Sequence, residues 1–367
     1  MTGMAASRIR TAILGYGRSG STLHADPIEK LSADFDLRAV CDIDPAAREK
    51  AGRRFGCTLH EDYRAMLRAG GLDLVVIVTR SDQHGTMTCD CLAAGVDVLV
   101  TKPWALDAAE ARRMIDAARS SGRRLLPWLP ARWGCDLARL SEIVASGAIG
   151  KVHLVRRAEM TLGTRSDWQT QRRHGGGYLL NWGPHLVDQP VQLLGGRVRS
   201  VWGDVKQLIN PGDAEDQFTA VLTLDDGALV IAEFGVGAAV LPTWVVQGTR
   251  GTIVVRDMAL EVHRATGRDA AGDYRGEAGV VVDREDLRGT HCITMANRYG
   301  DAMVIYPHIA RALRGEEPYA VSLDSALELT RVLDAVRRSA ATGAVVRMED
   351  APPAGDHPRS TALRQYS

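Results

Sequence analysis

A glycine motif near the start of the chain places the tightest limit on its fold. Residues 15–20 read G-x-G-x-x-G, directly after the apolar run Ile9–Leu14 and directly before a helical segment. In this context the first glycine permits a tight turn, the second lets the backbone approach a pyrophosphate, and the third lets helix and strand pack closely. The helix N-terminus then faces the phosphates. The motif predicts a Rossmann unit that binds a dinucleotide through Gly15, Gly17, Arg18, Ser19 and Gly20.

An acidic residue at the end of the next apolar run supports this interpretation. Asp42 lies 22 residues after Gly20. A carboxylate at this place accepts hydrogen bonds from the adenosine ribose hydroxyls. The next residue is Ile43, not an arginine or serine that could hold a 2′-phosphate. The sequence therefore favours NAD, with NADP as the alternative. An ordinary βα turn with a surface aspartate is the competing interpretation.

The first 130 residues alternate short apolar runs with helical segments. The later runs, at 37–42, 74–78, 96–100 and 125–129, are largely apolar on both faces, as buried parallel strands are. Capping residues and glycines mark where the helices begin and end. These signals are Asp26-Pro27, Asp44-Pro45, Asp107 with Glu110, Gly56 and Gly122. The alternation predicts an α/β fold with a doubly wound parallel sheet.

The pattern changes after Pro130. A helical segment at 137–146 leads to β-like runs at 152–160, 198–205, 218–224, 228–234, 244–247 and 252–255. Hairpin signals at 225–227 and 249–251 indicate an antiparallel sheet. Two helices are expected at about 301–314 and 322–341. We place the domains at 1–127 and 128–350, followed by a polar tail, 351–367, that is either flexible or an arm on a neighbouring subunit.

The composition excludes several classes of protein. The 45 basic and 45 acidic residues cancel, which leaves no electrostatic footprint for nucleic acid or an anionic membrane. No apolar run approaches the ~20 residues needed to cross a bilayer, and the N-terminus has no apolar signal core. The six scattered cysteines lack a zinc-ligand spacing. We expect a cytoplasmic protein without a metal site, whose cysteines are reduced and mostly buried.

Four features in a fixed order make the chain similar to the glucose–fructose oxidoreductase / inositol dehydrogenase (Gfo/Idh/MocA) family, over roughly residues 8–348. They are the glycine loop, Asp42, the tripeptide Thr101-Lys102-Pro103, and residues 175–188, which read GGGYLLNWGPHLVD. Within the family, the segment 131–133 and the Asp188-Gln189 pair resemble branches similar to scyllo-inositol dehydrogenase and the sugar dehydrogenases.

The resemblance implies a Rossmann domain, a second α/β domain with a large, mostly antiparallel open sheet, a nicotinamide cofactor and a sugar or polyol substrate. It places catalytic positions at Lys102, Asn181 and His185, with a Lys102–Pro103 bond that is often cis in the family. Two positions depart from the family pattern, because Thr101 replaces a glutamate and Asn181 replaces an aspartate. An amide cannot stabilise a protonated His185, although it can hydrogen-bond a substrate hydroxyl. This departure bears on turnover and choice of substrate.

Each candidate side chain also has a plainer interpretation. Lys102 follows a buried strand and is either a charge that stabilises an alkoxide or a solvated lysine. His185 is either the base for a hydroxyl proton or a core histidine. Thr79 is expected beside the cofactor, and His84 lies either near the nicotinamide ribose or on the surface. One or two of five further side chains are expected to line a sugar pocket: Arg132, Trp133, Trp168, Arg172 and Arg173.

These residues predict an NAD-dependent dehydrogenase that oxidises a secondary alcohol of a sugar, glycoside or inositol by hydride transfer. Two alternatives remain open. The enzyme could use bound NAD transiently to cleave glycosides through a keto intermediate, or the chain could be a non-catalytic NAD-binding regulator. Asn181 favours the regulator, whereas Lys102 and His185 oppose it. Because an open sheet must cover its apolar face, we also expect a homodimer or homotetramer.

Overall fold

The computed structural model describes residues 7–239, 241–266, 279–288 and 292–348, so the expected tail at 351–367 lies outside the described residues. The described residues up to Pro130, together with 173–175 and 301–331, pack as one compact unit, and the others pack as a second. No helix in these ranges is long and apolar enough to span a membrane. The same ranges contain no group of three or more His, Cys, Asp or Glu side chains that could hold a metal ion.

The first unit is built on a six-stranded parallel sheet in the order β3-β2-β1-β4-β5-β6. Its strands are β1 Ile9–Leu14, β2 Phe35–Cys41, β3 Thr58–His60, β4 Leu74–Ile77, β5 Asp97–Thr101 and β6 Leu125–Trp128. All four residues of β4 are buried, as expected for a strand with helices on both faces. The predicted doubly wound parallel sheet is confirmed. The short edge strand β3 was not expected, since it has no buried residue.

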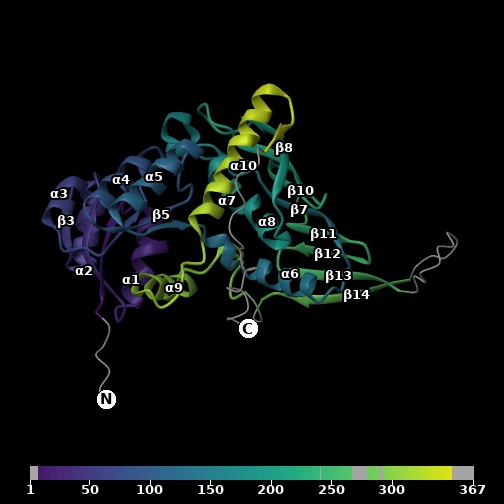
Figure 1. The fold of residues 1–367 in the computed structure, drawn as a ribbon, viewed down its shortest axis with the longest axis horizontal. Coiled ribbons are helices and arrows are strands. Elements are labelled where there is room, and N and C mark those ends of the chain that lie inside the picture. Colours follow the sequence, from purple (N-terminus) through teal and green to yellow (C-terminus); the bar gives the residue numbers. More distant parts are fainter. Residues whose placement is uncertain (1–6, 240, 267–278, 289–291, 349–367) are drawn as a thin grey trace, which may run out of the picture. The chain divides into compact units, whose positions relative to one another are not determined.

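Helices connect these strands in the first unit. They are the π-turn η1 Gly20–Ala25, α1 Asp26–Lys30, α2 Pro45–Phe55, α3 Tyr63–Ala69, the 3₁₀ turn η2 Ser81–Gln83, α4 His84–Ala93, α5 Ala108–Ser121 and α9 Ala302–Arg314. Figure 1 shows that α9, drawn in the yellow-green of the C-terminal region, lies beside α1 from the start of the chain. The helix α10, Leu323–Thr342, contributes residues to both units.

The predicted helix signals are confirmed in part. Asp44 caps α2, which ends at Gly56 in the left-handed region. Asp107 accepts a hydrogen bond from the Glu110 backbone, but the Glu110 carboxylate accepts from Leu106 N and so does not close the expected capping box. The first helix begins earlier than the Asp26-Pro27 signal indicates. Helical hydrogen bonding starts within the glycine loop, where Ser21 N donates to Gly17 O at 2.9 Å.

The second unit is built on a nine-stranded sheet in the order β14-β13-β12-β11-β7-β10-β9-β8-β15. Its strands are β7 Val152–Thr161, β8 Val198–Lys206, β9 Gln217–Leu224, β10 Leu229–Val236, β11 Trp244–Gly248, β12 Gly251–Arg256, β13 Ala259–Thr266, β14 Gly279–Asp286 and β15 Val346–Arg347. Only β7 and β10 pair in parallel, so the predicted mostly antiparallel sheet is confirmed. Both predicted hairpin turns are present, between β9 and β10 and between β11 and β12.

Helices of the second unit are α6 Cys135–Ala145, α7 Tyr178–Leu186 and α8 Asp188–Leu194, with short 3₁₀ turns at η4 Trp168–Thr170 and η6 Met295–Tyr299. The turns η3 Pro130–Trp133 and η5 Arg172–His174 each contribute residues to both units. Alternate residues of β9 are buried, which places one face of the sheet in the core. His185 lies inside α7. Gly177 precedes that helix at the N-cap position, and its φ of 109° suits glycine. Tyr178 N, at the first helical residue, donates to Glu215 O at 2.9 Å.

The expectation that all six cysteines are reduced is wrong for two of them. Cys135, at the start of α6, and Cys292, before η6, form a disulfide with a Cα–Cα distance of 5.5 Å. Both lie in one hydrophobic cluster of the second unit. A pairing across 157 residues arises from tertiary packing, which the cysteine spacing does not reveal. The other four are free, and burial raises the pKa of both Cys41 and Cys91 to about 12, which makes them inert thiols.

Candidate active site

The glycine loop has the geometry that a bound dinucleotide needs. Gly15 has a φ of 91°, and a Cβ there would lie 2.8 Å from the Val78 carbonyl oxygen. A Cβ on Gly20 would overlap the Gly15 carbonyl oxygen. Gly17 is exposed, with no atom within 4 Å of where its Cβ would be. Two glycines therefore make the turn and the close packing, and the third leaves open space for a pyrophosphate. Arg18 and Ser19 follow Gly17 directly in the chain, and their contact with a pyrophosphate stays a prediction.

Asp42 lies directly after β2 and is held against the glycine loop. Its Oδ2 accepts from Tyr16 N at 2.6 Å, and its Oδ1 accepts from Asp44 N at 2.9 Å. A carboxylate has about four acceptor sites, so two backbone donors leave capacity for ribose hydroxyls. The side chain of Ile43 is 80% exposed beside it. These residues fit an adenosine ribose without a 2′-phosphate.

Lys102, His84 and Thr79 all follow the carboxyl ends of the paired strands β4 and β5, at the same edge of the sheet. Lys102 follows β5 and is partly buried, and its bond to Pro103 is cis, as the family resemblance implies. The ring of His84 is buried, with Nδ1 2.8 Å from Pro103 O and Nε2 3.1 Å from Thr79 O. Burial lowers the pKa of His84. His84 thus ties the β4 end to the Lys102–Pro103 turn, and a contact of His84 or Thr79 with the cofactor stays a prediction.

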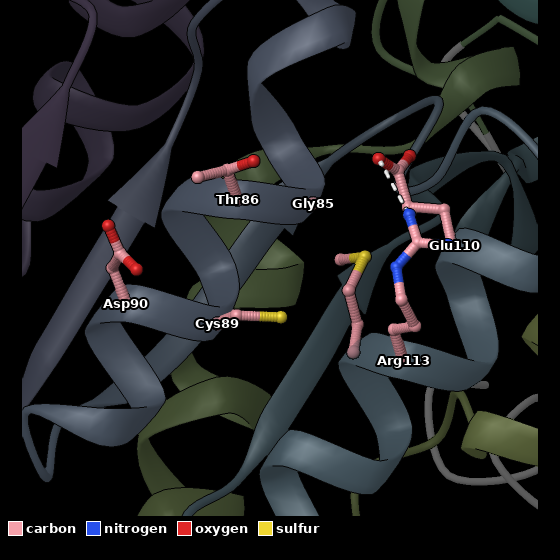
Figure 2. Close-up of a pocket in the computed structure, with 7 residues that line it drawn as sticks. Gly85, Thr86, Cys89, Asp90, Glu110 and Arg113 are labelled. Atoms are coloured by element: carbon pink, nitrogen blue, oxygen red, sulfur yellow. Dashed lines mark ion pairs between the residues drawn. The ribbon is translucent and has the colours of Figure 1, made fainter.

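A cavity on the first unit lies between α4 and α5, and Figure 2 shows its lining. Its volume is about 230 Å³, and Cys89 faces it from α4 while Glu110 and Arg113 come from α5. Gly85 permits this close helix packing, because a Cβ there would overlap the Glu110 carboxylate. None of the predicted site residues lines this cavity, so it is not part of the candidate site.

The second unit contributes Asn181 and His185, which lie four residues apart on one face of α7. Asn181 Nδ2 donates to Gln169 Oε1 at 2.7 Å, and Gln169 belongs to η4. The His185 side chain is buried, and its ring packs against Trp182 at 6.0 Å and Tyr299 at 5.3 Å between centroids. The structure therefore places both predicted positions of the second-domain motif together.

The five candidates for a sugar pocket have different surroundings. Arg132 makes two hydrogen bonds to the Asp188 carboxylate, at 2.8 and 2.9 Å, and this ion pair is largely buried. The guanidinium of Arg132 therefore anchors η3 to α8. Trp133 and Trp168 are partly buried, and Arg172 and Arg173 are exposed in η5. Contacts of these side chains with a substrate stay predictions.

Two family models match this chain. A model of the oxidoreductase family with an NAD-binding Rossmann fold matches residues 9–127, and a model of the GFO/IDH/MocA C-terminal domain matches residues 137–254. Together they cover more than half of the sequence. The chain belongs to the GFO/IDH/MocA family. It is therefore an oxidoreductase with an NAD-binding Rossmann domain.

Similar proteins include several inositol dehydrogenases. The myo-inositol 2-dehydrogenase of Thermotoga maritima is 25% identical over 330 residues, which are 88% of this chain and 93% of that protein. The NADP-dependent scyllo-inositol 2-dehydrogenase IolW of Bacillus subtilis is 23% identical over 359 residues, or 93% and 96% of the two chains. The solved structure of GenD2 from gentamicin A biosynthesis, in complex with NAD, has 26% identity and a TM-score of 0.78, covering 95% of this chain and 98% of GenD2.

The two departures from the GFO/IDH/MocA pattern have local explanations in the structure. Thr101 Oγ1 donates to Ile77 O at 3.0 Å, so the threonine links β5 to β4 where the family has a carboxylate. Asn181 has its amide directed at Gln169. A neutral pair therefore stands where the family has an aspartate, and neither residue carries charge at this position.

Several residues of this site were missed by sequence reasoning. Gln169 holds Asn181, and Glu215 lies against the start of α7, where a Cβ on Gly177 would overlap its carboxylate. Burial raises the pKa of Glu215. Arg157 and Glu159 lie two residues apart on β7, and Arg157 is fully buried. An arginine and a glutamate two residues apart in a strand lie on the same face of the sheet, and this spacing is the signal in the sequence that could have indicated them.

Removing the Asp42 carboxylate tests the cofactor preference. We expect Asp42→Ala to weaken NAD binding by about 1–3 kcal/mol, because ribose hydroxyls lose a charged acceptor. Isothermal titration calorimetry with NAD and NADP measures this. Asp44→Asn is the matched control, because it removes a charge two residues away and can still cap α2. Equal affinity of the unmodified protein for NAD and NADP would contradict the prediction.

Proposed function

We propose that this oxidoreductase is an NAD-dependent dehydrogenase that oxidises a secondary alcohol of a sugar, glycoside or inositol. The observation that carries the proposal is the position of Lys102, directly after β5 at the carboxyl edge of the NAD-binding sheet. Open α/β sheets bind ligands at that edge. The inositol dehydrogenases among the relatives support this class of substrate.

Three side chains divide the chemistry in this proposal. The Lys102 ammonium stabilises the negative charge that develops on the substrate oxygen. His185 accepts the hydroxyl proton, since imidazole titrates near working pH. Asn181 orients the substrate through a hydrogen bond to a hydroxyl. Bound NAD supplies the hydride acceptor. The second unit holds the polyol, and Trp133 and Trp168 are the aromatic side chains we favour for packing against its C–H face.

A turnover assay tests this proposal against its alternatives. The purified protein is incubated with NAD or NADP and a panel of sugars, glycosides and inositols, while NADH absorbance and product release are both followed. A dehydrogenase accumulates NADH in proportion to product. An enzyme that uses the cofactor transiently releases the glycoside's leaving group without net NADH. A regulator binds NAD and turns over nothing in the panel.

A carboxylate introduced at Asn181 tests the role of His185 as a base. We expect Asn181→Asp to move the acidic limb of the kcat/KM–pH profile to higher pH, because a nearby negative charge favours the imidazolium and raises the pKa of His185. The base is then protonated, and lost, at a higher pH than in the unmodified enzyme. Asn181→Ser is the control, since it removes the amide without adding charge. An acidic limb that stays in place in Asn181→Asp would contradict the assignment.

We also propose that the open face of the second sheet is an interface between copies of the chain. A cross-strand row runs through Trp202, Val221, Ile231, Arg156, Val245 and Val254, each paired in register with the next. Five of these six side chains are apolar, and none is buried in the single chain. An exposed apolar face of this kind marks an interface, and the same face on a second copy of the chain can pack against it.

A charge at the centre of that row tests the interface. We expect Ile231→Asp to convert the assembly to a monomer, because pairing would bury an unpaired carboxylate. Light scattering at micromolar concentration measures the mass against the 39.7 kDa of one chain. Val304→Asp, on an exposed position of α9 in the other unit, is the control. A monomeric unmodified protein would refute the proposal.

A further inference from the structure

Tyr299 packs against the histidine that we propose as the base. Its ring centroid lies 5.3 Å from that of His185, with an angle of 50° between the planes, and 5.4 Å from that of Trp182. Trp182 in turn stacks on Phe234 of β10 at 5.0 Å. The imidazole therefore packs in a cluster of three rings with Trp182 from its own helix and Tyr299 from a distant segment of the chain.

The hydroxyl of Tyr299 is fixed by two charged side chains of β7. It donates to Glu159 Oε1 and accepts from Arg157 Nη2 at 3.2 Å. Arg298, the preceding residue, also lies 3.7 Å from the Glu159 carboxylate. Burial raises the pKa of Tyr299 above its ordinary range, so the phenol stays protonated and can donate. These contacts leave the ring little freedom to turn.

Arg157 is the fixed point of this arrangement. Its side chain is fully buried, and it donates to Gln189 Oε1 at 3.0 Å, Thr243 O at 3.1 Å and Ala158 O at 3.2 Å. The guanidinium also lies over the Trp244 ring at 4.9 Å. A buried charge is tolerated only when its donors are satisfied, and this one is held by several elements of the second unit. Nothing in the proposed chemistry uses Arg157, Glu159 or Tyr299.

The segment that carries Tyr299 is itself anchored. Cys292, seven residues earlier, is bonded to Cys135 of α6. Arg298 O accepts from Gln189 Nε2 at 3.0 Å, and Oε1 of the same glutamine side chain accepts from Arg157. The backbone at 298–299 and the side chain of Arg157 therefore share one partner on α8.

We propose that Tyr299 is a positioning residue that fixes the ring orientation of His185, with Arg157 and Glu159 as its anchors. This inference rests on the proposed role of His185. A neighbouring carboxylate orients the base histidine in the Ser-His-Asp arrangement. Here the position four residues before His185 is a neutral amide that hydrogen-bonds Gln169. Aromatic packing from Tyr299 and Trp182 restricts the imidazole in this chain.

Two substitutions at Tyr299 separate its ring from its hydroxyl. Tyr299→Leu removes the ring, and Tyr299→Phe keeps it. We expect Tyr299→Leu to lower kcat about tenfold or more, because a misplaced base loses reactive geometry, while KM and the NAD dissociation constant change less than about twofold. We expect Tyr299→Phe, which keeps the packed ring but loses the hydrogen bonds to Glu159 and Arg157, to keep more of the kcat than Tyr299→Leu does. Tyr178→Leu is the matched control, since it removes a buried tyrosine that packs on Phe234 and starts the same helix.

A second measurement reads the orientation of His185 without turnover. In protein labelled with ¹³C at histidine Cε1, His185→Gln identifies the His185 resonance. We expect one narrow line in the unmodified protein and in Tyr299→Phe, and a broadened or doubled line in Tyr299→Leu as the ring samples a second orientation. If no alcohol is turned over, the proposed function fails, and this spectrum still decides whether Tyr299 orients the ring.

The proposal is overturned by any of three results. One is an unchanged kcat in Tyr299→Leu. Another is an equal loss of kcat in Tyr178→Leu, which would show a general packing effect. The third is a single narrow His185 line in Tyr299→Leu, which would show that the ring keeps its orientation without the tyrosine.

Discussion

Replacing Lys102 or His185 with alanine is expected to lower kcat roughly 100-fold or more in each case, the usual worth of a positioned acid–base or charge-stabilising group. Lys102 follows β5 and is partly buried beside Pro103, whose carbonyl oxygen is held by His84. His185 is buried in α7 and packs against the rings of Trp182 and Tyr299. Removal of either side chain is expected to cost rate more than fold.

Measuring NAD binding distinguishes a specific loss of catalysis from a general loss of structure. The NAD dissociation constant is expected to change little in Lys102→Ala and His185→Ala, because neither residue is proposed to contact the pyrophosphate or the adenosine. Lys151→Ala and His153→Ala are matched controls at exposed positions at the start of the second unit's sheet. Steady-state kinetics with the best substrate of the panel, together with NAD titration, measures both quantities. A kcat within a factor of three of the unmodified enzyme in either site variant would remove that residue from the mechanism.

The free energy of unfolding is expected to fall steeply in acid because of His24. This side chain lies in η1, directly after the glycine loop, and is fully buried. Its Nδ1 lies 2.8 Å from the Tyr306 hydroxyl, and its ring packs against Trp128 at 4.9 Å. Burial lowers the pKa of His24 to about 3. A histidine in the unfolded chain titrates near 6.5.

The sign of the effect follows from proton binding. Below about pH 6.5 the unfolded chain binds a proton at His24 that the folded chain does not bind until about pH 3. This stability is therefore present above pH 6.5 and is lost as the pH falls toward 3. The expected slope is about 1.4 kcal/mol per pH unit, with a total of about 5 kcal/mol from this residue.

Denaturant unfolding between pH 7 and pH 4 measures this slope. The variant His24→Asn keeps a polar atom near the Tyr306 hydroxyl but cannot titrate, so its slope is expected to be shallower by about 1.4 kcal/mol per unit. His153→Asn, at an exposed histidine, is the control and is expected to keep the slope of the unmodified protein. Burial also lowers the pKa of His84, so this residue adds to the loss of stability in acid. Its contribution is the same in all three proteins and cancels when their slopes are compared. Identical slopes in His24→Asn and the unmodified protein would contradict the prediction.

Local sequence signals predicted much of the fold because they act over a few residues. The glycine loop, the Asp44 cap and the glycine turn at 225–227 each depend on backbone geometry that a short segment sets for itself. The strands β1, β4 and β5 were found because strands covered on both faces are largely apolar. The edge strands β14 and β15 and the neighbouring strand β13 were not predicted, since a strand such as β14 is exposed along most of its length.

The residues of the candidate site also fall into those that local motifs predicted and those that only the tertiary structure revealed. Lys102, Asn181 and His185 were found from motifs in which every residue lies close in sequence to the others. By contrast, Tyr299 meets Glu159 across 140 residues, and Cys135 meets Cys292 across 157. Contacts at that separation depend on how strands and helices pack, not on the residues next to either partner. The sequence by itself therefore determined the type of fold, the cofactor loop and the candidates for the reacting groups, whereas only the tertiary structure decided what surrounds those side chains.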